Sequence, residues 1–246
     1  VMPDHVDPNG SLVTLLRQLG HDMRVPINTL ISTTDMLEQG LYDPLTPKQQ
    51  KAIDRLQRNH HRLLAMLDDF LTYIKANAGD MRLETTPFDP RAVTDKAVAC
   101  VKQMADEKQL VIKILMTERV PEKLFGDTQV INRILLALLW NAVAYTSVGS
   151  VDIMADWTAT GGLSIIIKDT GNGIASHELP HIFEPFWRGE ERPQIPTACA
   201  GLGLPLARAL SELMRGKLLL TETSSEGSTF CLSLPCIPKM NPDLQE

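Results

Sequence analysis

The sequence has no excess of positive charge and few cysteines. It carries 24 Lys and Arg against 30 Asp and Glu, a formal net charge of −6, so a nucleic-acid-binding surface is not expected. Its four cysteines, Cys100, Cys199, Cys231 and Cys236, show no paired metal-ligand spacing. Free thiols in a reducing compartment, the cytoplasm, are therefore the expectation.

The sequence also lacks a signal peptide, internal repeats, low-complexity tracts and any long hydrophobic run. Its longest apolar run, Ile134 to Trp140, is much shorter than the roughly 20 residues that a membrane-spanning helix needs. Because the first residue is Val1 rather than Met, we expect a piece of a longer protein, with any membrane attachment in other parts of the parent chain. What is present is an ordinary globular composition, with 43% hydrophobic residues in 246, enough for one large or two ordinary domains.

Two long amphipathic helices are predicted in the first third of the chain. Residues 1–10 are rich in Pro, Asp and Gly and are expected to be disordered. The first helix is predicted from about Ser11 to Gln39, and Thr46 is the predicted N-cap, with a capping box, of a second helix ending near Ala78. Two helices on a short loop make an antiparallel hairpin over residues 11–78, and because two helices cannot enclose both apolar faces, we expect a four-helix bundle in a homodimer.

The apolar residues of both helices recur at three- and four-residue steps, as in a coiled-coil seam. On the first helix they are Leu12, Leu16, Leu19, Met23, Ile27, Leu30 and Leu37. On the second they are Ile53, Leu56, His60, Leu63, Leu67, Phe70 and Ile74. This places His60 on the seam, where we expect it to pack, and leaves His61 in solvent.

His21 is the most unusual residue of the first predicted helix. It lies beside Asp22 and two residues from both Leu19 and Met23. At about 100° per residue its side chain turns away from the seam, towards water. Pro26 would remove the backbone bond to the Asp22 carbonyl, at a cost of roughly 3 kcal/mol inside a helix. On these residues alone, an ordinary solvent-facing histidine on a kinked helix is as good an interpretation as a functional histidine.

From about Met81 the pattern changes to interleaved strands and helices. The predicted strands are Met81–Thr85, Leu110–Met116, Val151–Trp157, Leu163–Asp169, Lys217–Glu222 and Thr229–Leu234. The predicted helices are Pro90–Gln109, one capped by Asp127 and running through Tyr145, and Gly203–Met214. The elements do not alternate strictly as βαβ units. We therefore predict an α+β sandwich over residues 79–246, with helices on one face of a mixed sheet.

Two glycine segments and one asparagine are candidates for ligand contacts. Asp169 to Ile174 reads Asp-Thr-Gly-Asn-Gly-Ile, which suits either a hairpin turn or a backbone that a ligand approaches closely, with Asp169 accepting a bond from a base amino group. Gly201 to Leu204 opens a helix, where free N–H groups suit phosphates, although it also suits a flexible helix start. Asn141 suits a surface position or an amide oxygen ligand for Mg²⁺. Between the glycine segments, Phe183–Ala200 is typical of a lid or a disordered loop.

In this order and spacing, the segments resemble the catalytic core of sensor histidine kinases of two-component signalling, over residues 11–236. Gly20–Asn28 resembles the phosphoacceptor box of this family. Asp127–Thr146 resembles the N box, Asp169–Ile174 the first glycine box, and Phe183–Phe186 the phenylalanine box. Gly201–Leu204 resembles the second glycine box, and Gly227–Phe230 the closing strand motif. Each motif alone is weak, and their order carries the resemblance. It implies that residues 79–246 adopt the ATP-binding (Bergerat) fold shared with Hsp90-type and gyrase-type ATPases.

The resemblance also implies roles for individual residues. Asp169 would hold the adenine amino group, Asn141 would hold Mg²⁺, and Tyr145 would flank the nucleotide. The other expected nucleotide contacts are Gly171, Gly173, Ile174, Gly201, Leu202, Gly203, Leu204 and Thr229. His21 would attack the γ-phosphate of ATP while Asp22 orients its ring and accepts its proton. The phosphoryl group would then pass to an aspartate of a response-regulator receiver domain.

Four positions depart from the family pattern. Ala137 and Ala144 stand where the N box usually has Asn and a Lys or Arg, and Cys199 stands where the second glycine box usually begins with Gly. Val25 stands where the family often has Thr, Ser or Asn to orient water for dephosphorylating the partner. Because valine cannot form a hydrogen bond through its side chain, the sequence predicts weak phosphatase activity and slow autophosphorylation.

Two alternative functions, and one candidate zinc site, stay beside the kinase interpretation. The departures favour a degenerate member that binds nucleotide poorly and acts as a regulatory or scaffolding partner. A second alternative is an Hsp90-type or gyrase-type ATPase that makes no phosphohistidine, against which the helical hairpin with His21 argues. The candidate zinc site is His177–His181, which has the literal His-Glu-x-x-His pattern but contains Pro180. We expect no zinc there.

Overall fold

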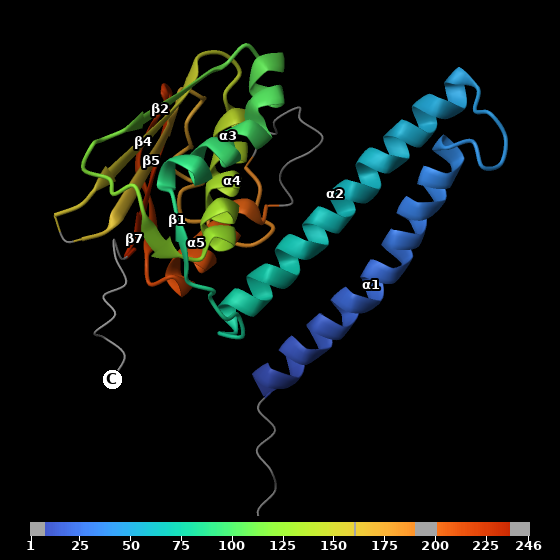
Figure 1. The fold of residues 1–246 in the computed structure, drawn as a ribbon, viewed down its shortest axis with the longest axis horizontal. Coiled ribbons are helices and arrows are strands. Elements are labelled where there is room, and N and C mark those ends of the chain that lie inside the picture. The colour runs from blue at the N-terminus through green and yellow to red at the C-terminus, as the bar shows by residue number, and fades with distance from the viewer. Residues whose placement is uncertain (1–7, 160, 190–200, 237–246) are drawn as a thin grey trace, which may run out of the picture. The chain divides into compact units, whose positions relative to one another are not determined.

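The computed structural model describes residues 8–159, 161–189 and 201–236. They form two compact units, with the boundary between Ala78 and Gly79 (Figure 1). The first unit is a pair of helices and the second combines two sheets with three helices. Each unit is described by itself below.

The first unit is the predicted antiparallel hairpin, made of α1 (Pro8–Glu38) and α2 (Pro47–Asn77) (Figure 1). Residues 8–10 belong to α1, so the expectation of disorder through residue 10 was wrong at these three positions. Proline suits the first position of a helix because its missing N–H would have no partner there, which explains a helix that begins at Pro8. The expectation for residues 1–7 lies outside the described residues.

The predicted capping box of α2 is confirmed. The Thr46 amide donates to Oε1 of Gln49 at 2.9 Å, and the Gln49 amide donates to Oγ1 of Thr46 at 3.4 Å. Two amides without helical partners are thereby satisfied at the start of α2. At the other end of the connection, Gly40 has a φ of +70°, the left-handed conformation in which glycine commonly ends a helix.

Few apolar side chains are buried where the two helices pack together. Ile27 of α1 contacts a buried cluster with Leu67 and Leu71 of α2. A Cβ at Gly20 would overlap the Leu71 side chain, so this glycine lets α2 approach α1 one residue before His21. His60 is buried as expected, and His61 is exposed with Nδ1 2.9 Å from the Gln57 carbonyl oxygen.

Most of the predicted seam of α1 is open in the single hairpin. Ile27 is 4% exposed, whereas Leu19 is 53% and Leu30 is 49% exposed. Leu19 and Leu30 are open because α2 covers only part of the apolar circumference of α1, as expected for two helices that cannot enclose both of their apolar faces. The uncovered residues form an apolar face on the hairpin.

The second unit contains a five-stranded mixed sheet and a separate two-stranded sheet. The larger sheet has the spatial order β2 (Val111–Met116), β4 (Ser150–Trp157), β5 (Leu163–Asp169), β7 (Gly227–Leu234) and β6 (Lys217–Ser224). The β2–β4 pair is parallel and the other pairs are antiparallel. The smaller sheet pairs β1 (Thr86–Phe88) with β3 (Leu124–Gly126).

One predicted strand of this unit is wrong. Residues 81–85 form no strand, and the short strand β1 begins only at Thr86. Residues 82–86 are exposed, so their alternating pattern does not mark a buried face. The backbone there is used differently, because the Glu84 amide donates to Oδ2 of Asp127 at 2.9 Å, just ahead of α4.

Three helices, α3 (Pro90–Glu107), α4 (Thr128–Tyr145) and α5 (Gly203–Leu213), lie together beside the larger sheet (Figure 1). Helix α4 provides much of the core, with Ile134, Leu135 and Val143 almost fully buried. On β5, Leu163, Ile165 and Ile167 are buried, while Ser164 and Ile166 between them are partly exposed. This alternation is that of a sheet covered on one face, and the predicted α+β sandwich is confirmed.

Candidate functional site

Helix α4 carries Asn141 and Tyr145 and is fixed at both ends. At its start, Oδ1 of Asp127 accepts from the amides of Gln129 and Val130, each at 3.0 Å. At its end, the amide and hydroxyl of Thr146 donate to the Ala142 carbonyl at 3.1 and 2.7 Å. Both Asn141 and Tyr145 are partly exposed, so their side chains reach the surface of the second unit.

Asp169 ends β5 as a buried carboxylate, 5% exposed. Its Oδ1 accepts from the Gly171 amide at 2.9 Å and from the Ser228 amide at 3.3 Å. Burial raises the pKa of Asp169, and hydrogen bonds from the amides of Gly171, Ser228 and Asp169 itself partly oppose that shift. The bonds from Gly171 and Ser228 both end on Oδ1.

The glycines around Asp169 are required by the protein's own backbone. A Cβ at Gly171 would lie 2.5 Å from the Tyr145 carbonyl oxygen, and one at Gly173 would overlap the Ser224 carbonyl. A Cβ at Gly227 would overlap the carbonyl oxygen of Asp169. The sequence-based explanation, that Gly171 and Gly173 allow a ligand to approach, therefore omitted a packing requirement. Close backbone contact joins the Asp169 segment to the end of α4 and to the β6–β7 hairpin.

Hydrogen bonds from β6 and β7 hold the same segment. The Ile174 amide donates to Oγ1 of Thr223 at 2.8 Å, and that hydroxyl lies 3.1 Å from Oγ of Ser228. Thr229, the expected neighbour of adenine, is 9% exposed on β7. Thr223 was missed by sequence reasoning because nothing in its local pattern distinguishes it from an ordinary strand residue.

The second glycine segment, Gly201–Leu204, lies beside α4 near Ala137. Gly201 has a φ of +72°, a Cβ there would lie 2.5 Å from the Trp187 carbonyl oxygen, and its own carbonyl accepts from the Phe186 amide at 2.8 Å. A Cβ at Gly203, the first residue of α5, would lie 3.9 Å from Cβ of Ala137. The start of α5 therefore adjoins the face of α4 that carries Ala137.

The two leucines of this segment differ in burial. Leu202 is 2% exposed and packs inside, so only its backbone can meet a ligand, whereas Leu204 is partly exposed. Leu202 is the N-cap of α5, and among the described residues no side chain caps this helix start. The first backbone N–H groups of α5 therefore have no side-chain cap among the described residues. Cys199 and most of the predicted lid, residues 190–200, lie outside the described residues.

Ala137 and Ala144 do not share one environment. Ala137 is partly exposed beside Gly203, but Ala144 is 4% exposed. Helical spacing puts Ala144 on the face of Asn141, but its side chain is covered there. Position 144 still makes a polar contact, but through its backbone: the Ala144 carbonyl oxygen accepts a hydrogen bond from Nζ of Lys108 at 2.8 Å.

His21 lies on α1 of the first unit, with 76% of its side chain exposed. Its Nδ1 is 3.4 Å from Oδ1 of Asp22, which also accepts from Nε2 of Gln18 at 3.0 Å. This long contact is consistent with a carboxylate that orients the imidazole through Nδ1. Nε2 is then the nitrogen through which an external group would react.

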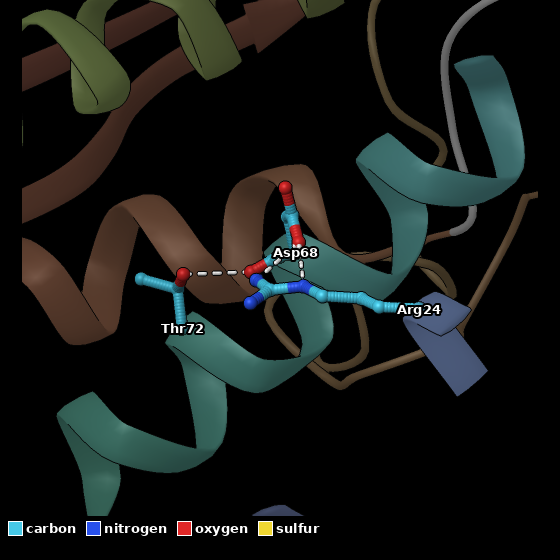
Figure 2. A network of polar contacts seen from close by, with 3 residues as sticks. All are labelled: Arg24, Asp68 and Thr72. Carbon is cyan, nitrogen blue, oxygen red and sulfur yellow. Dashed lines mark hydrogen bonds and ion pairs between the residues drawn. The ribbon is translucent and has the colours of Figure 1, made fainter. Parts of the chain in front are cut away.

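An ion pair ties α1 to α2 one turn beyond His21 (Figure 2). Nε and Nη2 of Arg24 donate to Oδ1 of Asp68 at 3.1 and 2.6 Å, and Oγ1 of Thr72 donates to the Asp68 backbone carbonyl at 2.6 Å. The side chains of Arg24 and Asp68 are 46% and 40% exposed, so solvent screens much of the attraction. The pair contributes mainly to the register of the two helices. Val25, the next residue, is 59% exposed.

The His-Glu-x-x-His segment, His177–His181, forms turns rather than the helix that a zinc protease needs. Nδ1 of His181 lies 3.0 Å from Oε1 of Glu184, within the same run of turns. Over residues 8–159, 161–189 and 201–236, no group of three or more His, Cys, Asp or Glu side chains is placed to hold a metal ion. In that part of the chain no helix has the length and hydrophobicity to span a membrane.

Two family models match the two units. Residues 11–79 match the His Kinase A (phospho-acceptor) domain. Residues 126–238 match the family described as histidine kinase-, DNA gyrase B- and HSP90-like ATPase. The matches contain His21 and the segments from α4 to β7, respectively.

Curated relatives and solved structures agree with these matches. The chain is 28% identical to the signal transduction histidine-protein kinase BarA of Escherichia coli K12 over 219 residues, which is 87% of this chain and 24% of BarA. It is 28% identical to the sensor protein GacS of Pseudomonas syringae over 235 residues, 94% of this chain and 26% of GacS. The chain thus spans about a quarter of the length of these relatives.

Among solved structures, full-length ShkA in complex with AMPPNP superposes with a TM-score of 0.79 at 26% identity, covering 91% of this chain and 46% of ShkA. The histidine kinase AdeS of Acinetobacter baumannii shares the fold, with a TM-score of 0.62 at 24% identity over 87% of this chain and 96% of AdeS.

Proposed function

Because the chain belongs to the sensor histidine kinases of two-component signalling, we propose that it transfers the γ-phosphoryl group of ATP to His21. The observation that carries this proposal is the exposed His21–Asp22 pair on a helical hairpin, in the same chain as an ATPase-type unit with a buried carboxylate, Asp169, at a strand end.

The second unit offers the parts that ATP requires. Oδ2 of Asp169 would accept a bond from the adenine amino group, and the first N–H groups of α5 would donate to phosphate oxygens. The amide oxygen of Asn141 fits Mg²⁺, which accepts few protein ligands and takes most of its oxygens from phosphates and water. Bound Mg²⁺ would neutralise charge on the phosphates, while Tyr145 would lie beside the nucleotide.

In the transfer step, Nε2 of His21 would attack the γ-phosphorus. A nitrogen–phosphorus bond forms, the bond between the γ-phosphorus and the bridging oxygen breaks, and ADP leaves with the bonding electrons. Asp22 would hold the ring through Nδ1, stabilise the positive charge that develops on the imidazole, and accept the Nδ1 proton. Most of the rate acceleration would come from positioning and from charge neutralisation.

The phosphohistidine would then donate its phosphoryl group to an aspartate of a response-regulator receiver domain. Support comes from the relatives named as a signal transduction histidine-protein kinase and a sensor protein, of whose length this chain spans about a quarter. We place the reaction in the cytoplasm, where ATP is available, and in a homodimer, because the hairpin leaves Leu19 and Leu30 open.

Incubation with γ-labelled ATP and Mg²⁺ tests the transfer. The parent protein should acquire acid-labile label, and His21→Gln should acquire none. His61→Gln is the matched control, because His61 is also an exposed histidine of the hairpin, and it should be labelled like the parent. Label that persists in His21→Gln would contradict the proposal.

The same experiment separates the two other candidate functions. Absence of both label and nucleotide binding in the parent would support a degenerate scaffolding partner, for which Ala137, Ala144 and Cys199 are the motivating departures. ATP hydrolysis that continues unchanged in His21→Gln would support an ATPase without phosphohistidine.

A further inference from the structure

Lys108 reaches the end of α4 from another helix. It is the C-cap residue of α3, and its Nζ donates to the carbonyl oxygens of Val143, Ala144 and Thr146 at 2.7, 2.8 and 2.9 Å. Lys108 and its three acceptors are 35 to 38 positions apart in the sequence, so these contacts exist only in the folded unit.

The hydrogen bonds of this ammonium group are saturated. A lysine ammonium has three N–H donors, and each has one carbonyl acceptor here. The last carbonyls of a helix have no partners within it and carry the negative end of its dipole, so a cation at this position is favourable. Lys108 is therefore a cap for α4, and it has no remaining donor for a phosphate.

The capped carbonyls lie on both sides of a contact with the Asp169 segment. Tyr145 stands between the residues that Lys108 binds, and its carbonyl oxygen is the atom that a Cβ at Gly171 would approach to 2.5 Å. The Gly171 amide in turn donates to Asp169. The position of the α4 end thus determines how closely the Asp169 segment can pack against it.

We propose that Lys108 is a positioning residue for the adenine nucleotide, fixing the last turn of α4 and, through Gly171, the carboxylate of Asp169. This inference rests on the proposed ATP binding. Lys108 touches neither the nucleotide nor His21 in this account, and it acts through backbone groups alone.

The test compares Lys108→Met, which keeps the side-chain length but removes the donors, with Lys108→Arg, which keeps the charge. Lys102→Met is the matched control, because Lys102 is exposed on the same helix and pairs only with Asp106 among the described residues. The dissociation constant for ADP with Mg²⁺ is measured by calorimetry at a temperature where each variant is folded, alongside its thermal midpoint.

We expect Lys108→Met to bind ADP about tenfold more weakly, Lys108→Arg to recover most of that loss, and Lys102→Met to match the parent. Amide hydrogen exchange in Lys108→Met should rise at residues 145–147 and at Gly171. If Lys108→Met fails to fold, Lys108→Gln, whose amide can satisfy up to two carbonyls, takes its place under the same criteria.

An ADP affinity within twofold of the parent in Lys108→Met, whatever its thermal midpoint, would overturn the positioning role and leave only a structural one. Failure of the parent itself to bind ADP would instead overturn the proposed ATP binding, and this inference with it.

Discussion

Asp169 is a carboxylate that the fold buries with two amide donors on one oxygen. Its pKa in the folded protein is raised above that of the unfolded chain, because burial disfavours the charged form. The folded protein therefore holds the proton more tightly, and the resulting stabilisation is complete below about pH 4 and is lost as pH rises through the raised pKa. At neutral pH the ionised group is a cost that a bound amino group would offset.

Asp169→Asn should therefore abolish ADP binding without lowering stability at pH 7. The free energy of unfolding of the parent relative to Asp169→Asn should fall as pH rises from about 4 through the raised pKa of Asp169, measured by urea titration at several pH values. A relative stability that grows with pH over this range would show that the carboxylate is not disfavoured by burial.

Val25 bears on the phosphatase activity of the proposed kinase, that is, on removal of phosphate from the regulator. Its exposed side chain, one helical turn after His21, cannot orient a water molecule. Val25→Thr should remove phosphate from a phosphorylated regulator faster than the parent, by at least severalfold, while Val25→Ala should not. The rate is measured as release of inorganic phosphate, and equal rates for Val25→Thr and the parent would contradict the explanation.

At the scale of elements, α4 depends on its cap more than α3 does. Asp127 is 8% exposed and accepts three backbone N–H groups, from Glu84, Gln129 and Val130, whereas the N-cap of α3, Asp89, accepts one from Arg91. An ordinary N-cap contributes about 0.5–2 kcal/mol. The contribution of Asp127 should lie at or above the upper end of this range, because its loss leaves the buried Val130 amide unpaired and removes two further amide bonds.

Asp127→Ala should therefore lower the free energy of unfolding of the second unit by about 2 kcal/mol or more, and Asp89→Ala, the matched control, by about 1 kcal/mol or less. Urea denaturation monitored by circular dichroism measures both. Equal losses would mean that the three amide bonds of Asp127 contribute no more to stability than the one amide bond of Asp89.

The elements also show what the sequence could predict. Long periodic helices and strands with buried alternating residues, such as Leu163–Asp169, are predictable because their patterns extend over several turns or pairs. The strands β1 and β3 have three residues each, too few to show a periodic pattern. The alternation of residues 81–85 was misleading because residues 82–85 are exposed and pack against no core.

For the candidate site, sequence motifs located Asp169, Asn141 and the glycines, but the reasons for them needed coordinates. Gly171 and Gly227 are required because distant carbonyl groups, of Tyr145 and Asp169, approach them. Lys108 could not be found from the sequence, since its partners lie more than thirty residues away and are backbone atoms that carry no residue signature.

At the scale of the whole molecule, the hairpin is incomplete as a single copy. Leu19 and Leu30 are about half exposed on α1, and burial of such side chains stabilises an interface by about 25 cal/mol per Å². A second hairpin would cover them in a four-helix bundle.

Leu30→Glu should therefore shift the protein from dimer to monomer at micromolar concentration, because a carboxylate would be placed in that interface. Sedimentation equilibrium measures the shift. Val148→Glu, at a site 82% exposed in the second unit, is the control and should leave the mass unchanged. A Leu30→Glu protein that remains dimeric would exclude this face as the dimer contact.

In the proposed reaction the γ-phosphoryl group of ATP reaches one nitrogen of one histidine. Tandem mass spectrometry of the protein after incubation with ATP and Mg²⁺, at neutral to alkaline pH where phosphohistidine survives, locates that group directly. We expect the phosphate on His21 and none on His60 or His61. Phosphate on another residue, with His21 unmodified after complete turnover of ATP, would contradict it.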